Sequence, residues 1–353
     1  MVSTTGSCGV LSDHTALCWG DWESSMIRVA AAAAELRDVS ELRIGHAIKL
    51  DPQRYYDHLC SRDLNHAVQC WGNNQQGQVG AAVSGDAASP SPVDLPANVT
   101  QLALGAQHSC ALTPPGEVRC WGNNEFGQAG AGTGTPTVAR PRAVAGLAPV
   151  AQLVTGSDST CAVTADHRVY CWGQNRNEQA TAAETGFEPE VWTPREIAIA
   201  RGSERLAAGR STYCGIQEAG SVMCWGFVGS LLGDAYLKHA SGPVPGLAGV
   251  TALGLGDHHA CALTGGGEVW CFGKGEHGEL GNGEPTPTTQ PPRRVALPGP
   301  ATAISVGAQA ACARLQDGRW WCWGGNRSGE LAADKQPIWT PAVLELSKID
   351  RAG

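Results

Sequence analysis

The stretch "HSCALTPPGEVRCWG", residues 108–122, places two cysteines ten residues apart and follows the second with Trp-Gly. The same spacing occurs seven times in the 353 residues and accounts for all 14 cysteines. The pairs are Cys8 with Cys18, Cys60 with Cys70, Cys110 with Cys120, Cys161 with Cys171, Cys214 with Cys224, Cys261 with Cys271 and Cys312 with Cys322. Recurrence at a fixed interval is typical of repeat proteins. The chain therefore reads as seven tandem repeats centred on these pairs.

Other residues recur in phase with the cysteines. Successive first cysteines lie 52, 50, 51, 53, 47 and 51 residues apart. An aromatic residue and a glycine follow each second cysteine: Trp19-Gly20, Trp71-Gly72, Trp121-Gly122, Trp172-Gly173, Trp225-Gly226, Phe272-Gly273 and Trp323-Gly324. From the third repeat on, a glycine also stands five residues before the first cysteine: Gly105, Gly156, Gly209, Gly256 and Gly307. The repeat is thus about fifty residues long.

Each cysteine pair is expected to face across a β-hairpin. Alternating apolar runs such as "VTQLALG" (99–105) favour strands. Pairing Cys110 with Cys120 leaves a three-residue loop that ends at Gly116, and four of the seven loops end in glycine in this way. Glycine takes the left-handed conformation that such loops require at little cost. Opposed cysteines come near the reach of a disulfide, while Trp121 points to the other face, toward a neighbouring repeat.

Zinc binding is the alternative use of these cysteines. A structural zinc ion needs four ligands, and each hairpin offers two thiols. A histidine two residues before the first cysteine would add a third ligand, but only His58, His108 and His259 stand there. We therefore predict seven disulfides, each worth about 2–3 kcal/mol. Disulfides imply an oxidising compartment, so we expect an extracellular or periplasmic protein whose leader is not part of this chain.

The stretch "LALGAQHSCALTPPGEVRCWGNNEFGQAG" (102–130) resembles the repeat of the regulator of chromosome condensation family. That resemblance implies an all-β fold, a seven-bladed β-propeller. Cysteine pairs within the hairpins look like those of secreted bacterial members. We expect one propeller over residues 1–353, closed into a ring where residues near 340–353 complete the blade of Cys8 and Cys18.

Several stretches depart from the repeat. Residues 21–58 form an irregular first connection, in which "IRVAAAAAELRDVSEL" (27–42) could hold a short helix. Residues 46–57 are inserted between Gly45 and His58 and are expected to form a loop. The Gly-Gln pair after Trp-Gly is missing from the fourth and fifth repeats, which read "NRNEQATA" (175–182) and "FVGSLLGD" (227–234).

Composition narrows the classes of function. The chain has 25 basic and 33 acidic residues, a net charge of −8 and no basic block, so we do not expect a nucleic-acid partner. No apolar run is long enough to span a bilayer. We expect no catalytic residue, no metal and no cofactor, because the repeated residues are those of packing. His58, His108 and His259 are expected to satisfy backbone groups between strands.

The remaining candidates are surface loops. In a propeller, the loop after each turn glycine and the loop after Trp-Gly should meet on one face. Aromatic and arginine side chains there suit a binding surface. The candidates are Tyr55, Tyr56, Phe126, Asp158, Arg176, Arg210, Asp257, His258, His277 and Arg327.

Three functions remain open. The first is a non-enzymatic, secreted and monomeric binding scaffold that recognises a protein or a glycan through these loops. The second is guanine-nucleotide exchange on a small GTPase, the founding activity of the family. The third is a propeller enzyme, a lyase or a hydrolase. Acidity and disulfides oppose the second, and the absence of a repeated catalytic constellation opposes the third.

Overall fold

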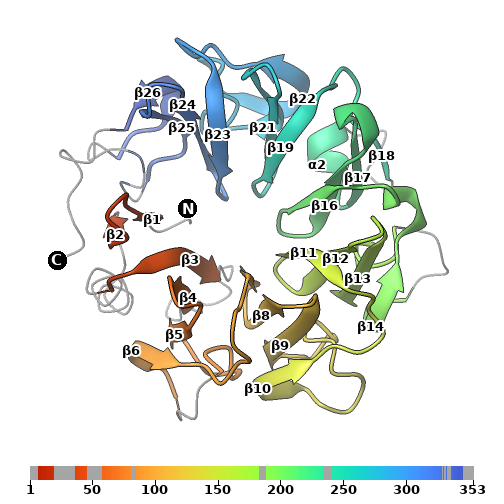
Figure 1. Ribbon diagram of the computed structural model, residues 1–353. Helices are drawn as coiled ribbons and strands as arrows, with labels where there is room; N and C mark the ends of the chain where they lie inside the picture. The colour runs from red at the N-terminus through yellow and green to blue at the C-terminus, as the bar shows by residue number, and fades with distance from the viewer. Residues whose placement is uncertain are drawn as a thin grey trace. The chain divides into compact units, whose positions relative to one another are not determined.

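The computed structural model describes residues 7–19, 36–45, 58–80, 85–182, 188–233, 241–327, 329, 331 and 335–344. These residues form seven antiparallel sheets, one for each repeat, and almost no helix (Figure 1). The chain divides into two compact units. The N-terminal unit holds residues 8–18 and the described part of 22–201, and the C-terminal unit holds Ser7, Trp19 and the described part of 202–351.

The N-terminal unit contains a two-stranded sheet and three four-stranded sheets, in which strands that are consecutive in the chain pair with one another. The strands are β1 (Ser7–Val10) and β2 (Ala16–Trp19); β3 (Val39–Gly45), β4 (His58–Asp63), β5 (Val68–Gly72) and β6 (Ala87–Pro92); β7 (Gln101–Leu104), β8 (His108–Thr113), β9 (Glu117–Asn123) and β10 (Thr137–Ala143); β11 (Val150–Thr155), β12 (Ser159–Thr164), β13 (Val169–Gln174) and β14 (Glu190–Glu196). A 3-10 turn, η1 (Ala198–Ala200), follows β14.

The C-terminal unit repeats the same four-stranded sheet three times. Its strands are β15 (Arg205–Ala208), β16 (Thr212–Ile216), β17 (Val222–Gly226) and β18 (Gly242–Pro243); β19 (Val250–Leu255), β20 (His259–Thr264), β21 (Val269–Gly275) and β22 (Thr286–Arg294); β23 (Ala301–Val306), β24 (Ala310–Leu315), β25 (Trp320–Gly324) and β26 (Ile338–Val343). The short helices are η2 (Glu218–Gly220) and α2 (Gly229–Leu232).

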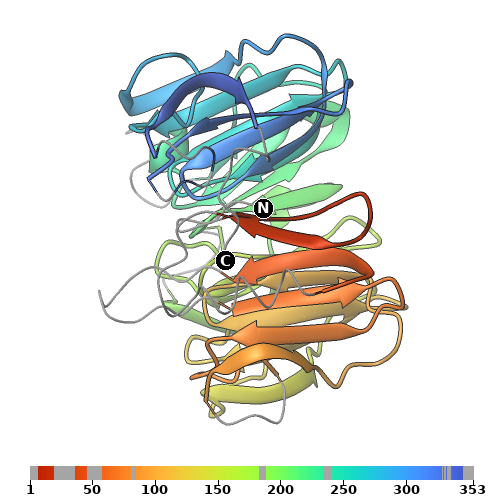
Figure 2. The same cartoon turned by 90° about the vertical axis from the view of Figure 1, so that its left-hand side faces the viewer.

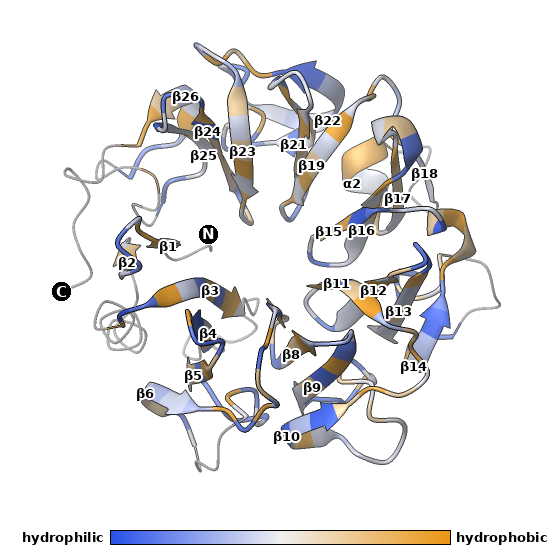
Figure 3. Ribbon diagram, viewed as in Figure 1, coloured by the Kyte–Doolittle hydropathy of each residue, from blue (hydrophilic) through white to orange (hydrophobic). Residues whose placement is uncertain are grey.

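Within each unit, the core lies between consecutive sheets. The first strand of one sheet contacts the first strand of the next, so that β3, β7 and β11 form one series and β15, β19 and β23 another. Figure 2 shows the sheets of the N-terminal unit stacked in this way. Every residue of the second strands β8 and β12 is buried, whereas the last strands β14 and β22 are largely polar (Figure 3). Burial on both faces explains why the second strands are rich in small and apolar residues.

The predicted hairpins and disulfides are confirmed. All seven cysteine pairs form disulfides across a hairpin, with Cα atoms 4.0–4.1 Å apart. The bonds join Cys8 to Cys18, Cys60 to Cys70, Cys110 to Cys120, Cys161 to Cys171, Cys214 to Cys224, Cys261 to Cys271 and Cys312 to Cys322. No cysteine remains free, so no thiolate is left for zinc. Gly116 closes its three-residue loop with φ 112°.

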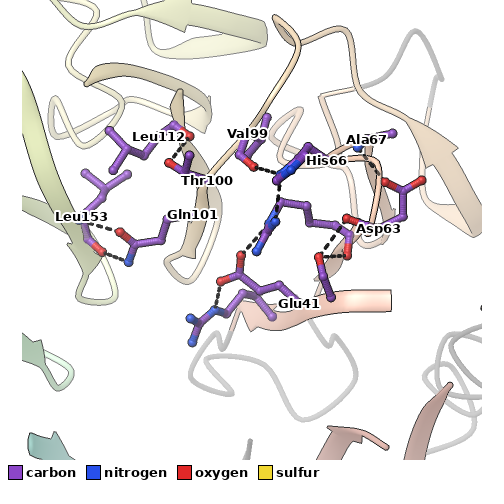
Figure 4. A network of polar contacts seen from close by, with 12 residues as sticks. Glu41, Asp63, His66, Ala67, Val99, Thr100, Gln101, Leu112 and Leu153 are labelled. Carbon is purple, nitrogen blue, oxygen red and sulfur yellow. Dashed lines mark hydrogen bonds and ion pairs between the residues drawn. The ribbon is translucent and has the colours of Figure 1, made fainter. Parts of the chain in front are cut away.

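Histidine replaces glycine in the other three hairpin loops. His14, His66 and His167 have φ of 63°, 66° and 58°, the left-handed conformation that glycine takes elsewhere. The His14 Nδ1 lies 3.2 Å from the Val39 carbonyl oxygen and the His66 Nδ1 lies 3.0 Å from that of Val99. Figure 4 shows the second contact, in which a hairpin loop reaches the chain that enters the next sheet.

Three of the tryptophans that follow a cysteine, Trp121, Trp172 and Trp323, also hold two sheets together. The indole N–H of Trp121 donates to the Gln78 carbonyl at 2.8 Å, and that of Trp172 to the Gln128 carbonyl at 3.0 Å. Both acceptors lie in the loop that follows Trp-Gly in the preceding sheet. The prediction that these side chains pack against the neighbouring repeat is therefore confirmed, and the bond explains why the aromatic residue is usually tryptophan.

Two of the three buried histidines, His58 and His108, bond to hydroxyl groups of the next sheet. The His58 Nε2 lies 2.7 Å from the Ser109 Oγ, and Ser109 donates its proton to the Gln78 carbonyl at 2.9 Å. Because that hydroxyl proton is already used, Nε2 must be the donor to Ser109. His108 and Thr160 repeat the arrangement at 2.9 Å. The expected backbone partner is present for His259, through Ala310, whereas His58 and His108 bond to a side chain that the next sheet supplies.

The irregular stretch 21–58 contains a regular strand. Val39–Gly45 forms β3, so the part of the expected helix that the structure describes is strand from Val39 on. Tyr55, Tyr56 and the rest of 46–57 lie outside the described residues, but the flanking Gly45 and His58 pair directly. Ring closure by the chain ends stays a prediction, because 345–353 also lie outside them. No described helix is long and apolar enough to cross a membrane.

The fourth repeat keeps the loop conformation of the other repeats although it lacks the Gly-Gln pair. The Asn177 N–H donates to the Gln179 side-chain oxygen at 2.8 Å, as the Phe126 N–H does to Gln128 at 2.9 Å. Glu178 takes the place of the glycine, with φ 58°. In the fifth repeat, which also lacks the Gly-Gln pair, α2 takes the place of this loop.

Candidate binding surface

Two loop sets meet at the same end of five of the seven sheets. The residue after Trp-Gly donates its backbone N–H to the carbonyl of the second residue after the turn glycine. The bonds are Asn123 to Gln107 (2.8 Å), Gln174 to Asp158 (2.8 Å), Phe227 to Ser211 (3.0 Å), Lys274 to His258 (2.8 Å) and Gly325 to Gln309 (2.7 Å). The candidates among the described residues therefore share one end of their sheets.

The loop after Trp-Gly is held in shape by its own amide side chains. The Asn124 side-chain oxygen accepts the Ala129 N–H at 3.0 Å, and its amide donates to the Thr135 carbonyl at 2.8 Å. Asparagines at the same place in other sheets accept the equivalent N–H: Asn74, Asn175 and Asn326. A loop that is ordered before binding loses less conformational entropy when it binds. These loops are therefore suited to present side chains to a partner.

The described candidates divide between the two units. Phe126, Asp158 and Arg176 belong to the N-terminal unit. Arg210, Asp257, His258, His277 and Arg327 belong to the C-terminal unit. Arg176, Arg210, His258 and Arg327 are exposed and the other four are partly buried. Arg176, Arg210 and Arg327 thus present positive charge to solvent at this end of three sheets.

Two pairs of candidates are in contact. The Arg176 guanidinium carbon lies 5.8 Å from the centre of the Phe126 ring, within the range of a cation–π interaction. In the C-terminal unit, the Arg327 Nη2 lies 3.0 Å from the His277 Nε2. Phe126 and His277 both precede the glycine of their loop by one residue, and each arginine comes from the equivalent loop of the next sheet. Sequence reasoning named these residues singly and did not pair them.

Two tryptophans that the sequence analysis did not select adjoin these pairs. A Cβ on Gly127, next to Phe126, would lie 2.8 Å from the Trp192 Cα, and a Cβ on Gly278, next to His277, would lie 3.2 Å from the Trp339 Cα. Both tryptophans are partly buried. Val-Trp-Thr-Pro at 191–194 and Ile-Trp-Thr-Pro at 338–341 give the signal that could have identified them. Among the described residues, no group of three or more His, Cys, Asp or Glu side chains could hold a metal ion.

Comparison with known proteins agrees with this geometry. The RCC1-like domain matches residues 58–352. This chain belongs to that family. One relative, the regulator of chromosome condensation of Mus musculus, is 24% identical over 312 residues, which cover 78% of this chain and 72% of that protein. The ultraviolet-B receptor UVR8 of Arabidopsis thaliana is 28% identical over 289 residues, or 77% of this chain and 63% of the receptor.

A solved structure shares the fold of this RCC1-like chain. Yeast RCC1 (Prp20), in its crystal structure bound to Kap60, superposes with a TM-score of 0.74 at 19% identity, covering 87% of this chain and 75% of that one. The predicted propeller fold of the family is thereby confirmed. The chain spans about 63% of the length of UVR8. Neither relative's activity is carried over by this degree of likeness.

Proposed function

We propose that this RCC1-like chain is a secreted, non-enzymatic binding scaffold that recognises a protein or a glycan through the loop ends of its sheets. The observation that carries the proposal is a contrast within these loops: their backbone and amide groups are hydrogen-bonded inside the loop, while several charged side chains are exposed to solvent. The exposed side chains include Arg176, Arg210, His258 and Arg327. Membership of a family of binding proteins supports the same conclusion.

Secretion is supported by the disulfides. All 14 cysteines are paired, one bond for each repeat. Such bonds persist in oxidising compartments and are rare in the reducing cytosol. The proposal therefore looks for a partner among extracellular molecules.

Capture of a partner from extracellular medium, together with a glycan array, tests this function. We expect the wild-type chain to retain a defined protein or glycan, and a variant with Arg210→Gln and His258→Gln to retain less of it, because both side chains lie on the loop that follows a turn glycine. Arg319→Gln is the matched control: Arg319 is exposed and bonds to Asp317 in a hairpin loop at the opposite end of its sheet. Equal capture by all three proteins would count against the proposal.

Guanine-nucleotide exchange is a second candidate, favoured by the match to the mouse regulator of chromosome condensation. Its test is the rate at which a Ran-type GTPase releases labelled nucleotide with and without this chain. Acceleration that the Arg210→Gln, His258→Gln variant reduces would support exchange over simple binding.

A further inference from the structure

The two aromatic–arginine pairs and their tryptophans form equivalent sites, which we call Trp–Arg seams. The N-terminal seam consists of Phe126, Arg176 and Trp192; the C-terminal seam consists of His277, Arg327 and Trp339. In each, the first residue lies in the loop of one sheet, while the arginine and the tryptophan lie in the loop and the last strand of the next sheet. We propose that both seams take the same element of a partner protein: a carboxylate side chain flanked by an apolar one. This rests on the proposed binding function.

The arginines are oriented before any ligand arrives. Arg176 is exposed and its guanidinium lies over the Phe126 ring. Arg327 is exposed and one of its nitrogens bonds to His277, whose other ring nitrogen lies 3.3 Å from the Glu279 carboxylate. A guanidinium held at one face or edge keeps further N–H groups for a carboxylate, which it binds through two parallel hydrogen bonds. Side-chain ordering on binding therefore costs little.

The tryptophans supply the apolar contact. Trp192 in β14 and Trp339 in β26 occupy equivalent positions, one residue after the residue that pairs with the Trp-Gly glycine. Each lies directly over the loop glycine of the preceding sheet. Their partial exposure leaves part of the indole available to a partner. Tryptophan and arginine are the residues most enriched at the energetic centres of protein interfaces. A protein segment is therefore a better match for these seams than a glycan.

The flanks of the two seams also agree. An exposed glutamate precedes the first residue in both, Glu125 before Phe126 and Glu276 before His277. Like charges repel, so the carboxylate of the partner is directed to the arginine side and a basic residue is favoured on the glutamate side. The matched segment thus carries an acidic, an apolar and a basic side chain in close succession.

The chain itself provides a seam without this chemistry. Between the sheets β3–β6 and β7–β10, the equivalent positions hold Gln76, Glu125 and Ala139. A Cβ on Gly77 would lie 3.0 Å from the Ala139 Cα, which is the same close approach that Gly127 makes to Trp192. An alanine is therefore compatible with the packing at this place. Trp192→Ala and Trp339→Ala should fold, and so separate a loss of binding from a loss of structure.

Selection of random twelve-residue peptides displayed on phage, with the full chain as bait, tests the proposal. Selected peptides should carry Asp or Glu beside an aromatic or aliphatic residue. In calorimetry with the synthetic peptide, two peptides should bind each wild-type chain, and Arg176→Gln with Trp192→Ala should leave one. The weakened seam should lose about tenfold or more in affinity, as expected for interface residues of this type. Phe126→His, which copies the C-terminal seam, should keep affinity within about threefold.

Several results would overturn the inference: no selected peptide, selected peptides without an acidic residue, or unchanged affinity when both seams carry the Gln and Ala substitutions. Peptides that bind only when phosphorylated would also overturn it. Arg319→Gln serves again as the control. If the seam variants still capture the extracellular partner while Arg210→Gln with His258→Gln does not, the proposed function stands and the role of the seams falls.

Discussion

A single hydroxyl decides whether the Nε2 atom of a buried histidine has a hydrogen-bond partner. The hydroxyl groups of Ser109 and Thr160 each accept a hydrogen bond from the histidine of the preceding sheet and donate one to a loop carbonyl. On the sheet that follows His259, the equivalent position is occupied by Ala311. Ala311 lies opposite Trp323, just as Ser109 lies opposite Trp121. The His259 Nε2 consequently has no hydrogen-bond partner among the described residues. A buried polar atom without a hydrogen-bond partner destabilises the fold.

Ala311→Ser should therefore stabilise the chain by about 1 kcal/mol, the usual net contribution of a buried hydrogen bond. The new hydroxyl can accept from His259 and donate to the Glu279 carbonyl, which already receives the Trp323 indole N–H at 3.0 Å. Denaturant unfolding measures the change. Ser109→Ala is the converse variant and should destabilise by a similar amount or more. Destabilisation by both substitutions would show that the alanine site has no room for the hydroxyl.

At the scale of the element, a hairpin loop does two things when histidine replaces glycine. His66 takes a left-handed conformation, which is unfavourable for a residue with a Cβ, and its ring reaches the Val99 carbonyl of the next sheet. Nearby, the Gln101 side chain spans to β11 through two bonds with Leu153, at 2.7 and 3.0 Å (Figure 4). The backbone hydrogen bonds between the strands of one sheet do not reach the next sheet. Side chains of the hairpin loops and of the first strands therefore join consecutive sheets.

His66→Gly and His66→Ala separate these two effects. Both remove the side-chain contact, worth about 1 kcal/mol, but only glycine also relieves the backbone, by a similar amount. We expect His66→Gly to be close to the wild type and His66→Ala to be about 1 kcal/mol less stable than His66→Gly. The midpoint of urea unfolding measures the order. Equal loss in the two variants would remove backbone strain from the explanation.

At the scale of the whole molecule, buried histidines in both units set the response to acid. Burial lowers the pKa of His58, His108 and His259 to about 3 in each case. The charge of His108 lowers the pKa of His58 further, and that of His258 lowers the pKa of His259 further. A hydrogen bond with the Ala310 backbone acts in the opposite direction on His259. A histidine in the unfolded chain titrates near 6.5, so between these values the unfolded state binds more protons than the folded state. Stability is therefore lost as the pH falls below about 6.5.

Between pH 6.5 and 4.5 each of these histidines should cost on the order of 2 kcal/mol of stability. Thermal unfolding across this range measures the slope. Arg168 and Arg201 lower the pKa of Glu196 to about 2. The stability that such carboxylates contribute is therefore lost mainly below this pH range and does not account for the slope. His108→Ser, which copies Ser159 of the next repeat, should flatten the slope by about one third. A wild-type melting temperature that does not change over the range would contradict the assignment.

The repeat was readable from sequence because its marks are local. Cys110 and Cys120 face each other through a hairpin of three loop residues, and the Trp-Gly that follows lies on the same strand. Period-two alternation and glycine at a left-handed position depend only on neighbours in the chain. At His66 and Glu178 a residue other than glycine takes that position. The residue type there does not predict a left-handed backbone, although the structure has the same conformation as at the glycines.

The amino-acid sequence by itself determined the seven repeats, their hairpins, the disulfide pairing and the end of each sheet that carries the loops. Only the tertiary structure decided which side chains of one repeat meet those of the next: His58 with Ser109, Phe126 with Arg176, and Gly127 with Trp192. These partners lie 50 to 65 residues apart and on different sheets. Their contact depends on how consecutive sheets pack, and spacing along one strand does not encode that.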